Sequence, residues 1–220
     1  MNQHLIDNWD DIKKPGRDDD VEGFLWQTWQ VFLDTAEQTP HDHPGHDKLV
    51  QVIIELTKLP SRKVHKESTL WSDLPILGPS LREAWIAPEV RAEKIPSEAA
   101  TKWIRLNSFT ARLSDAGFLK NSLFGLWSIL LALEDTGLSR SGLECSVAAA
   151  AEWIVHAQRV LLENGARMDA TGEEDRPMLA GRLCDGPSRF SSHRWEFWRR
   201  RFGEVGGVAR DCVVRMVRAG

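Results

Sequence analysis

The residues from His41 to Asp47 place three histidines and two aspartates within seven positions. Imidazole nitrogens and carboxylate oxygens are ligands that zinc accepts in proteins, so this stretch has the chemistry of a metal site. A loop this short does not fix a tetrahedral geometry, and no second ligand cluster in the sequence completes one. We therefore expect a solvated turn between two helices, and we predict neither a metal ion nor a cofactor.

Asn107 is a polar residue on an apolar helix face, between Trp103 four positions before it and Thr110 three positions after it. A buried amide without a hydrogen-bond partner costs about 1–3 kcal/mol. The sequence therefore predicts a definite partner for Asn107.

Glu134 has the same character, because it ends the apolar line that begins at Trp127. A buried carboxylate needs a counter-charge, and Arg105 and Arg112 on the neighbouring helix are candidates. Two interpretations stand. One is a structural lock of Asn107, Glu134 and an arginine between two core helices. The other is the polar floor of a pocket, with Glu134 acting as an acid or base.

His156 shares a helical line with Ala149, Trp153 and Val160, which predicts a half-buried imidazole. Such a histidine is either structural or catalytic. The nucleophile-elbow, phosphate-loop, zinc-protease and dinucleotide-binding motifs are all absent from the sequence, so the common enzyme classes have no signature here.

The segment 193–217 is predicted to be a basic, aromatic helix with a kink near Gly206. Trp195, Trp198 and Phe202 form one apolar face, and Arg194 and Arg201 border it. Seven arginines face three acidic residues between positions 194 and 218, a local excess of four positive charges. This helix either seals the bundle or presents a surface to a membrane or an acidic partner.

The chain has 220 residues, 27% charged and 42% hydrophobic, as expected of one globular domain. The net charge of −4 argues against a nucleic-acid binder, and no apolar run is long enough to span a membrane. Residues 1–20 are acidic and lack the features of a secretory signal. Three widely spaced cysteines favour free thiols, and hence a cytoplasmic protein.

Hydrophobic spacing is helical nearly everywhere. We predict an all-α, single-domain bundle of six or seven helices over residues 21–220, after an acidic tail at 1–20. The stretch 61–96, rich in proline, is expected to form a connecting belt, and 167–188 a long loop. The predicted helices are 21–36, 47–59, 98–114, 123–134 (central), 144–163 (ending at Gly165) and the C-terminal one.

Several sequence segments, taken in their order along the chain, resemble a fungal family of tryptophan-rich, all-helical proteins of unknown function. They are Trp71–Pro75, Trp103–Leu113, Leu126-Trp127, Leu133-Glu134, Ala149–Ile154, Gly186-Pro187 and Arg194–Phe202. The resemblance implies a helical protein of similar length and brings no catalytic residue with it. Asn107, Arg112, Glu134, Arg194, Trp195, Trp198 and Arg201 lie on these segments.

Two functions follow as alternatives. The first is a pocket for a small hydrophobic metabolite, in which Glu134 or His156 shuttles a proton during a cofactor-free isomerisation, cyclisation or dehydration of fungal secondary metabolism. The residues expected to line it are Asn107, Arg112, Trp103, Trp127, Trp153, Arg194, Trp198 and Arg201. The second is a non-enzymatic module that binds a protein partner through the basic, aromatic C-terminal helix.

Overall fold

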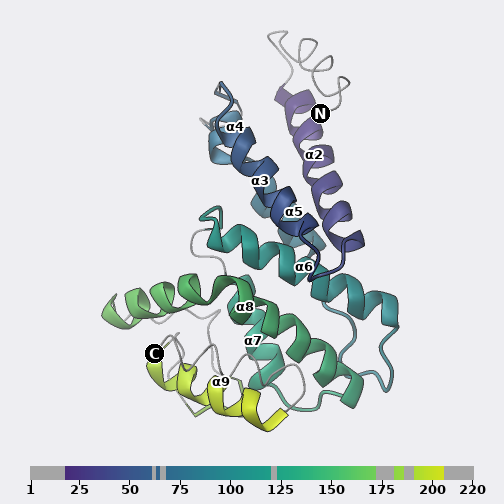
Figure 1. The fold of residues 1–220 in the computed structure, drawn as a ribbon, viewed down its shortest axis with the longest axis vertical. Helices are drawn as coiled ribbons and strands as arrows, with labels where there is room; N and C mark the ends of the chain where they lie inside the picture. The colour runs from purple at the N-terminus through teal and green to yellow at the C-terminus, as the bar shows by residue number, and fades with distance from the viewer. Residues whose placement is uncertain are drawn as a thin grey trace. The chain divides into compact units, whose positions relative to one another are not determined.

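A computed structural model of the chain describes residues 18–60, 63–64, 68–119, 123–171, 181–185 and 191–205. Within these residues the regular structure is helical, apart from one antiparallel bridge between Lys63 and Thr69. The helices are α2 (Asp18–Gln38), α3 (Gly45–Thr57), α4 (Leu70–Asp73), α5 (Leu77–Ala84), α6 (Ser97–Asp115), α7 (Phe124–Leu133), α8 (Arg140–Thr171) and α9 (Ser192–Val205) (Figure 1). The predicted all-α class is confirmed.

The described residues contain eight helices, where the sequence predicted six or seven. The additional elements are the short helices α4 and α5, which form in the stretch expected to be a belt; α5 carries Pro79 in its first turn, where a proline is tolerated. None of the described helices is both long and apolar enough to cross a membrane.

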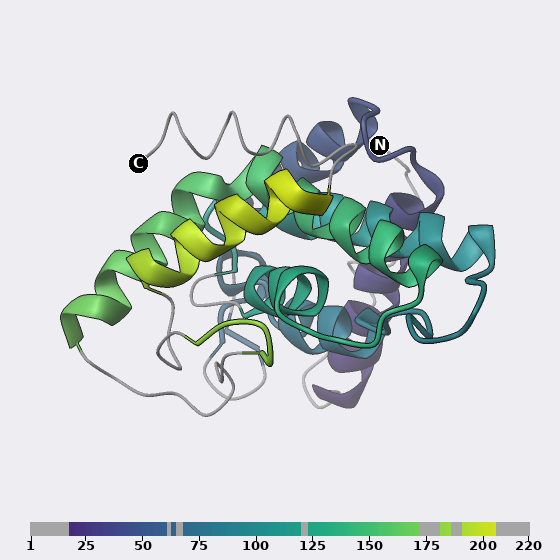
Figure 2. The same ribbon diagram turned by 90° about the horizontal axis from the view of Figure 1, so that it is seen from below.

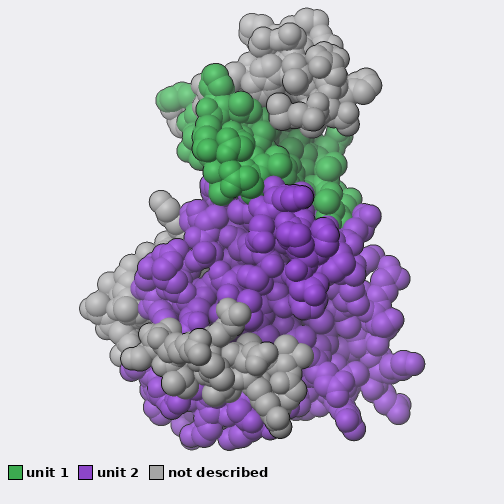
Figure 3. Space-filling model, viewed as in Figure 1, with its two compact units in different colours: residues 1–35, 51–85 green, residues 36–50, 86–220 purple. Residues whose placement is uncertain are grey.

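The chain divides into two compact units, which Figure 3 distinguishes by colour. The first consists of residues 1–35 and 51–85, and the second of residues 36–50 and 86–220. Every sequence-predicted site residue belongs to the second unit.

Trp29 is the centre of the first unit, where its side chain is fully buried. Its ring meets that of Trp71 edge-on at 6.4 Å, and its indole nitrogen donates to the carbonyl of Pro75 at 2.7 Å. Leu74 and Ile76, on either side of this proline, have φ values of 47° and 69°. The left-handed backbone, strained for non-glycine residues, lets α4 and α5 turn sharply around the indole.

The core of the second unit is formed by α6, α7 and α8, which pack against one another. Helix α9 contacts both α7 and α8 and runs alongside α8 (Figures 1 and 2). As predicted, α7 is apolar on almost all sides, and most of its residues are buried. Gly125 on α7 allows close packing, because an added Cβ would lie 2.6 Å from the Trp153 ring of α8.

Helix α8 is longer than the sequence predicted, because it continues past Gly165 to Thr171. The prediction that this glycine ends the helix is wrong: one glycine weakens a helix by about 1 kcal/mol without forcing it to stop. The helix is interrupted instead at Ala157 (φ −133°, ψ 17°), directly after His156. The predicted kink near Gly206 and most of the expected acidic tail and 167–188 loop lie outside the described residues.

The start of α8 approaches the backbone of residue 90 so closely that Gly142 is required. An added Cβ would lie 1.8 Å from the Val90 carbonyl oxygen, which already accepts hydrogen bonds from the Ser139 amide and hydroxyl. We predict that Gly142→Ala lowers the free energy of unfolding by about 1–3 kcal/mol in urea denaturation.

Gly23→Ala is the matched control, because Gly23 is an exposed position of α2 with no atom within 4 Å of an added Cβ. It should keep or raise stability, by up to about 1 kcal/mol. Equal effects of the two substitutions would contradict the close packing at Gly142.

Candidate functional site

The sequence-predicted polar residues fall into three buried groups, each with its own partners. The first is centred on Asn107 of α6. Its amide oxygen accepts hydrogen bonds from Ser128 Oγ of α7 at 2.6 Å and from Trp153 Nε1 of α8 at 2.8 Å. Its amide nitrogen donates to the Trp103 carbonyl at 2.9 Å. Asn107 therefore has the definite partner that the sequence predicted, and it ties three helices together.

The second group is centred on Glu134, at the end of α7. Its Oε1 accepts from Arg194 Nε at 2.9 Å and from Trp198 Nε1 at 2.5 Å. Its Oε2 accepts from Arg194 Nη2 at 2.9 Å and from the Gly181 amide at 2.7 Å. Both Glu134 and Arg194 are completely buried, and the guanidinium lies 5.4 Å from the centre of the Trp198 ring.

These contacts make Glu134 a structural anchor for α9 and for the segment 181–185. Four hydrogen bonds already engage its two carboxylate oxygens, and its side chain has no exposed surface. A proton shuttle needs a position that a substrate can reach. A structural role therefore fits Glu134 better than a catalytic one, but the predicted lock is not formed as expected. Its arginine is Arg194, and Asn107 belongs to a separate group. Arg201 lies beside this group, because its Nε donates to the Leu133 carbonyl at 3.4 Å.

The third group is centred on Glu152 of α8. Its Oε1 lies 2.9 Å from His41 Nδ1. Its Oε2 accepts from Ser108 Oγ at 2.6 Å and lies 3.4 Å from Nε2 of His156, one helical turn further along α8. One carboxylate thus bridges two imidazoles, and the kink at Ala157 follows the second of them directly.

Glu152 is buried, but its two histidines reach the solvent. The side-chain exposure is 9% for Glu152, 24% for His156 and 50% for His41. Burial alone would raise the pKa of Glu152. Hydrogen bonds from His156 and Ser108 and the charges of both histidines outweigh burial and hold the pKa of the carboxyl below its ordinary value of 4.5. The Glu152 carboxyl is therefore an anion at neutral pH, in contact with two imidazoles that are more exposed than it is.

Arg112 of α6 fixes this third group from the other side. Its Nη1 donates to the hydroxyl and the carbonyl of Ser108, and its Nη2 donates to the His41 carbonyl at 3.3 Å. Its Nε pairs with Asp47 at 2.8 Å. The carboxylate partner of Arg112 is thus Asp47, and Arg112 holds the 41–47 turn against α6.

Sequence reasoning singled out His156 and Arg112 but missed Glu152, Ser108 and the role of His41. A signal was present, because Glu152 and His156 are four residues apart, as are Ser108 and Arg112, which places each pair on one helix face. The contact of His41 with Glu152 spans 111 residues and has no local signal. The described residues contain no cluster of three or more histidine, cysteine, aspartate or glutamate side chains able to hold a metal.

Trp127 is 37% exposed and packs edge-on against Phe124 at 5.6 Å. By contrast, Trp103, Trp153 and Trp198 are buried. The tryptophans expected to wall one pocket are thus distributed: Trp103 and Trp153 contact Asn107, whereas Trp198 contacts Glu134.

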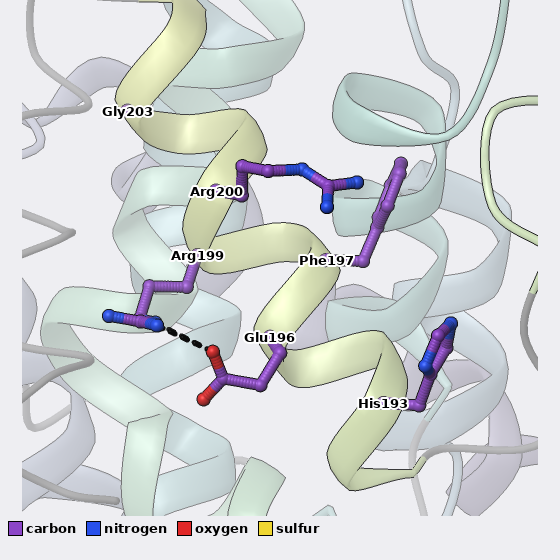
Figure 4. A pocket seen from close by; sticks show the side chains of 6 residues that line it. All are labelled: His193, Glu196, Phe197, Arg199, Arg200 and Gly203. Carbon is purple, nitrogen blue, oxygen red and sulfur yellow. Dashed lines mark hydrogen bonds and ion pairs between the residues drawn. The ribbon is translucent and has the colours of Figure 1, made fainter.

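A groove of about 600 Å³ follows the outer side of α9 (Figure 4). The Arg200 guanidinium lies 5.4 Å from the centre of the Phe197 ring, and Arg199 pairs with Glu196 at 2.6 Å. The described residues that line the groove are His193, Glu196, Phe197, Arg199, Arg200 and Gly203.

A tryptophan-rich helical bundle with buried polar groups is the class of protein that these features define. The chain belongs to the family described as "Protein of unknown function (DUF3632)", whose model matches residues 29–202. The predicted membership of a family of unknown function is therefore confirmed. No curated protein and no solved structure matches the chain.

We predict that Glu134→Gln lowers the free energy of unfolding by about 3–5 kcal/mol in urea denaturation, because it leaves the Arg194 guanidinium buried without its counter-charge. Glu196→Gln is the control, since it removes an exposed pair with Arg199 and should leave stability close to that of the wild type. Comparable small effects of both substitutions would contradict the anchoring role of Glu134.

Proposed function

We propose that the protein binds a small molecule and moves a proton from one position of that molecule to another. His156 is the acid or base, and Glu152 orients the His156 ring and compensates its positive charge. The observation that carries this proposal is the contact of the buried, anionic Glu152 with two solvent-reaching imidazoles. An imidazole oriented by a carboxylate is a common arrangement for general acid–base catalysis.

The proposed chemistry needs no cofactor, because one side chain can remove a proton from carbon and return it elsewhere. Isomerisation, cyclisation and dehydration are reactions of this kind. A small hydrophobic metabolite is the proposed substrate class, and fungal secondary metabolism the proposed setting, in line with the family resemblance. Glu134 has no part in the reaction, since its carboxylate is already engaged by Arg194, Trp198 and Gly181.

The cytoplasm is the proposed compartment. Cys145 is a free, buried thiol, and Cys184 is buried as well. Burial raises the pKa of Cys145 to about 11, which keeps that sulfur protonated and unreactive. Free thiols of this kind are typical of a reducing environment.

Proton removal from carbon is measurable before the product is known. We predict that the wild-type protein, incubated in D₂O with a panel of hydrophobic 1,3-dicarbonyl compounds, accelerates deuterium incorporation next to the carbonyl of at least one of them. Mass spectrometry follows the incorporation. His156→Gln and Glu152→Gln should lower the rate by about 10²–10⁴-fold, the usual contribution of a general acid or base.

His193→Gln is the matched control, because it removes a histidine of α9 that lines the separate groove. Circular dichroism and urea unfolding check that each variant remains folded. The proposal would be wrong if His156→Gln retained the wild-type rate, or if wild-type incorporation equalled that of the buffer across the panel.

A second function is favoured by the groove along α9: binding of a protein partner that carries acidic and apolar groups. The groove places the guanidinium groups of the half-exposed Arg199 and the exposed Arg200 near the ring of Phe197, which is itself buried. Helix α9 is anchored to the bundle by Arg194 and Trp198. A firmly anchored helix can present such a surface without reordering.

We predict that reversing both charges, with Arg199→Glu and Arg200→Glu together, raises the Kd for a captured partner at least about tenfold in surface plasmon resonance, as expected for loss of complementary charge. Arg140→Glu is the control, because Arg140 is an exposed arginine at the start of α8. A partner that binds the double variant as tightly as the wild type would exclude this surface.

A further inference from the structure

His46 is a buried histidine at the start of α3 that the proposed reaction does not use. Its side chain is fully buried, and its ring centre lies 6.2 Å from that of Phe109. Its Nε2 lies 3.1 Å from the Thr39 carbonyl oxygen. A carbonyl only accepts hydrogen bonds, so Nε2 carries the hydrogen. The buried Nδ1 has no hydrogen-bond partner among the described residues, which identifies a neutral imidazole.

The hydrogen bond between His46 and Thr39 closes the turn that carries His41. Within the turn, the His43 amide donates to the Pro40 carbonyl at 3.0 Å, and the His46 amide donates to the His43 carbonyl at 3.2 Å. Space inside the turn is so small that an added Cβ at Gly45 would lie 2.8 Å from His43 Nδ1 and 2.9 Å from Thr39 Cγ2.

Closure of this turn places His41 in the Glu152 group. The His41 carbonyl accepts from Arg112 Nη2 and lies 2.9 Å from Ser108 Oγ, and the ring reaches Glu152. His46 touches none of the proposed reacting groups through a hydrogen bond, but it fixes the ends of the turn that brings one of them into place.

We infer that His46 is a positioning residue for the Glu152 group: in its neutral form it holds His41 against Glu152, and its protonation releases the 39–46 turn. The role of this release in controlling proton transfer rests on the proposed function, whereas the release itself does not.

The groups around His46 shift its pKa in opposite directions. Burial lowers its pKa below the ordinary value of 6.5, its bond to the Thr39 carbonyl raises it, and the Arg112 guanidinium of α6 lowers it further. Glu152 of α8 and Asp47 of α3 raise it. The net pKa is lowered, and both carboxylates are already engaged, Glu152 by His41 and Asp47 by Arg112.

The sign of the pH dependence follows from this balance. In the released turn His46 regains its ordinary pKa, so below pH 6.5 the released form binds a proton that the closed form does not. Acidification therefore favours release, by up to about tenfold for each pH unit until the lowered pKa of the closed form is reached. Glu152 has a pKa below its ordinary value of 4.5, so its carboxyl stays ionised between pH 6.5 and pH 5.5.

Amide hydrogen exchange at His43 and His46, corrected for intrinsic rates, measures the release directly, because these two amides donate the hydrogen bonds of the turn. In the wild type we expect their protection to fall by up to about fivefold between pH 6.5 and pH 5.5, because half of the released form is already protonated at pH 6.5, while amides of α7 keep theirs. His46→Gln can still donate to the Thr39 carbonyl but cannot ionise, so its protection should be equal at the two pH values.

His41→Gln and His156→Gln are matched controls, which should keep the wild-type pH dependence of exchange. The inference would be overturned if wild-type protection did not fall, or if His46→Gln showed the same fall. The wild-type result alone remains decisive if that variant does not fold.

Exchange is measured without substrate, so its outcome is separate from that of the deuterium incorporation experiment. Where incorporation is observed, its rate should decline more steeply from pH 6.5 to pH 5.5 in the wild type than in His46→Gln. Incorporation without any acid-dependent exchange would leave the proposed reaction standing and remove the role of His46.

Discussion

A charge removed from water must find its partner inside the protein, and the structure of the second unit depends on how this is done for Glu134. The carboxylate ends α7, and its partner Arg194 begins α9, so one ion pair joins two helices that are 60 residues apart in the chain. Trp198 and the Gly181 amide complete the coordination. Breaking such a pair costs more than the pair itself gains, which makes the arrangement of α7, α9 and the segment 181–185 difficult to alter piecemeal.

Glu152 is a second buried carboxylate, and a different set of hydrogen-bond donors stabilises its charge. The donors to Glu134 are a guanidinium, an indole and a backbone amide, and both Glu134 and Arg194 are completely buried. The donors to Glu152 include two imidazoles, which are the side chains that change charge most readily in this range. The two buried carboxylates therefore differ in their contacts. Glu134 holds α9 and the segment 181–185 in place, whereas Glu152 contacts two imidazoles.

The fold was largely predictable from the sequence, because helical spacing, proline stops and the all-round apolar character of α7 are local signals. Gly165 misled because one glycine weakens a helix without ending it. Helices α4 and α5 are additional to the predicted helices, and the indole of Trp29 contacts the left-handed turn between them from far along the chain. The need of Asn107 for a partner followed from burial alone. Burial alone did not identify the partners of Glu134 or the contact of His41 with Glu152. Both depend on which helices become neighbours in space.

The hydrogen bonds of two indoles have a practical consequence. Trp153 donates to a neutral amide oxygen in the centre of the bundle, whereas Trp198 donates to a carboxylate beside a guanidinium at α9. The N–H stretching frequency and the absorption of an indole shift with the strength and charge of its acceptor, so the two rings have distinct spectral signatures. Detachment of α9 and loosening of the central helices are thus two separate optical events, to be assigned among the ten tryptophans by comparison with variants that lack Trp153 or Trp198.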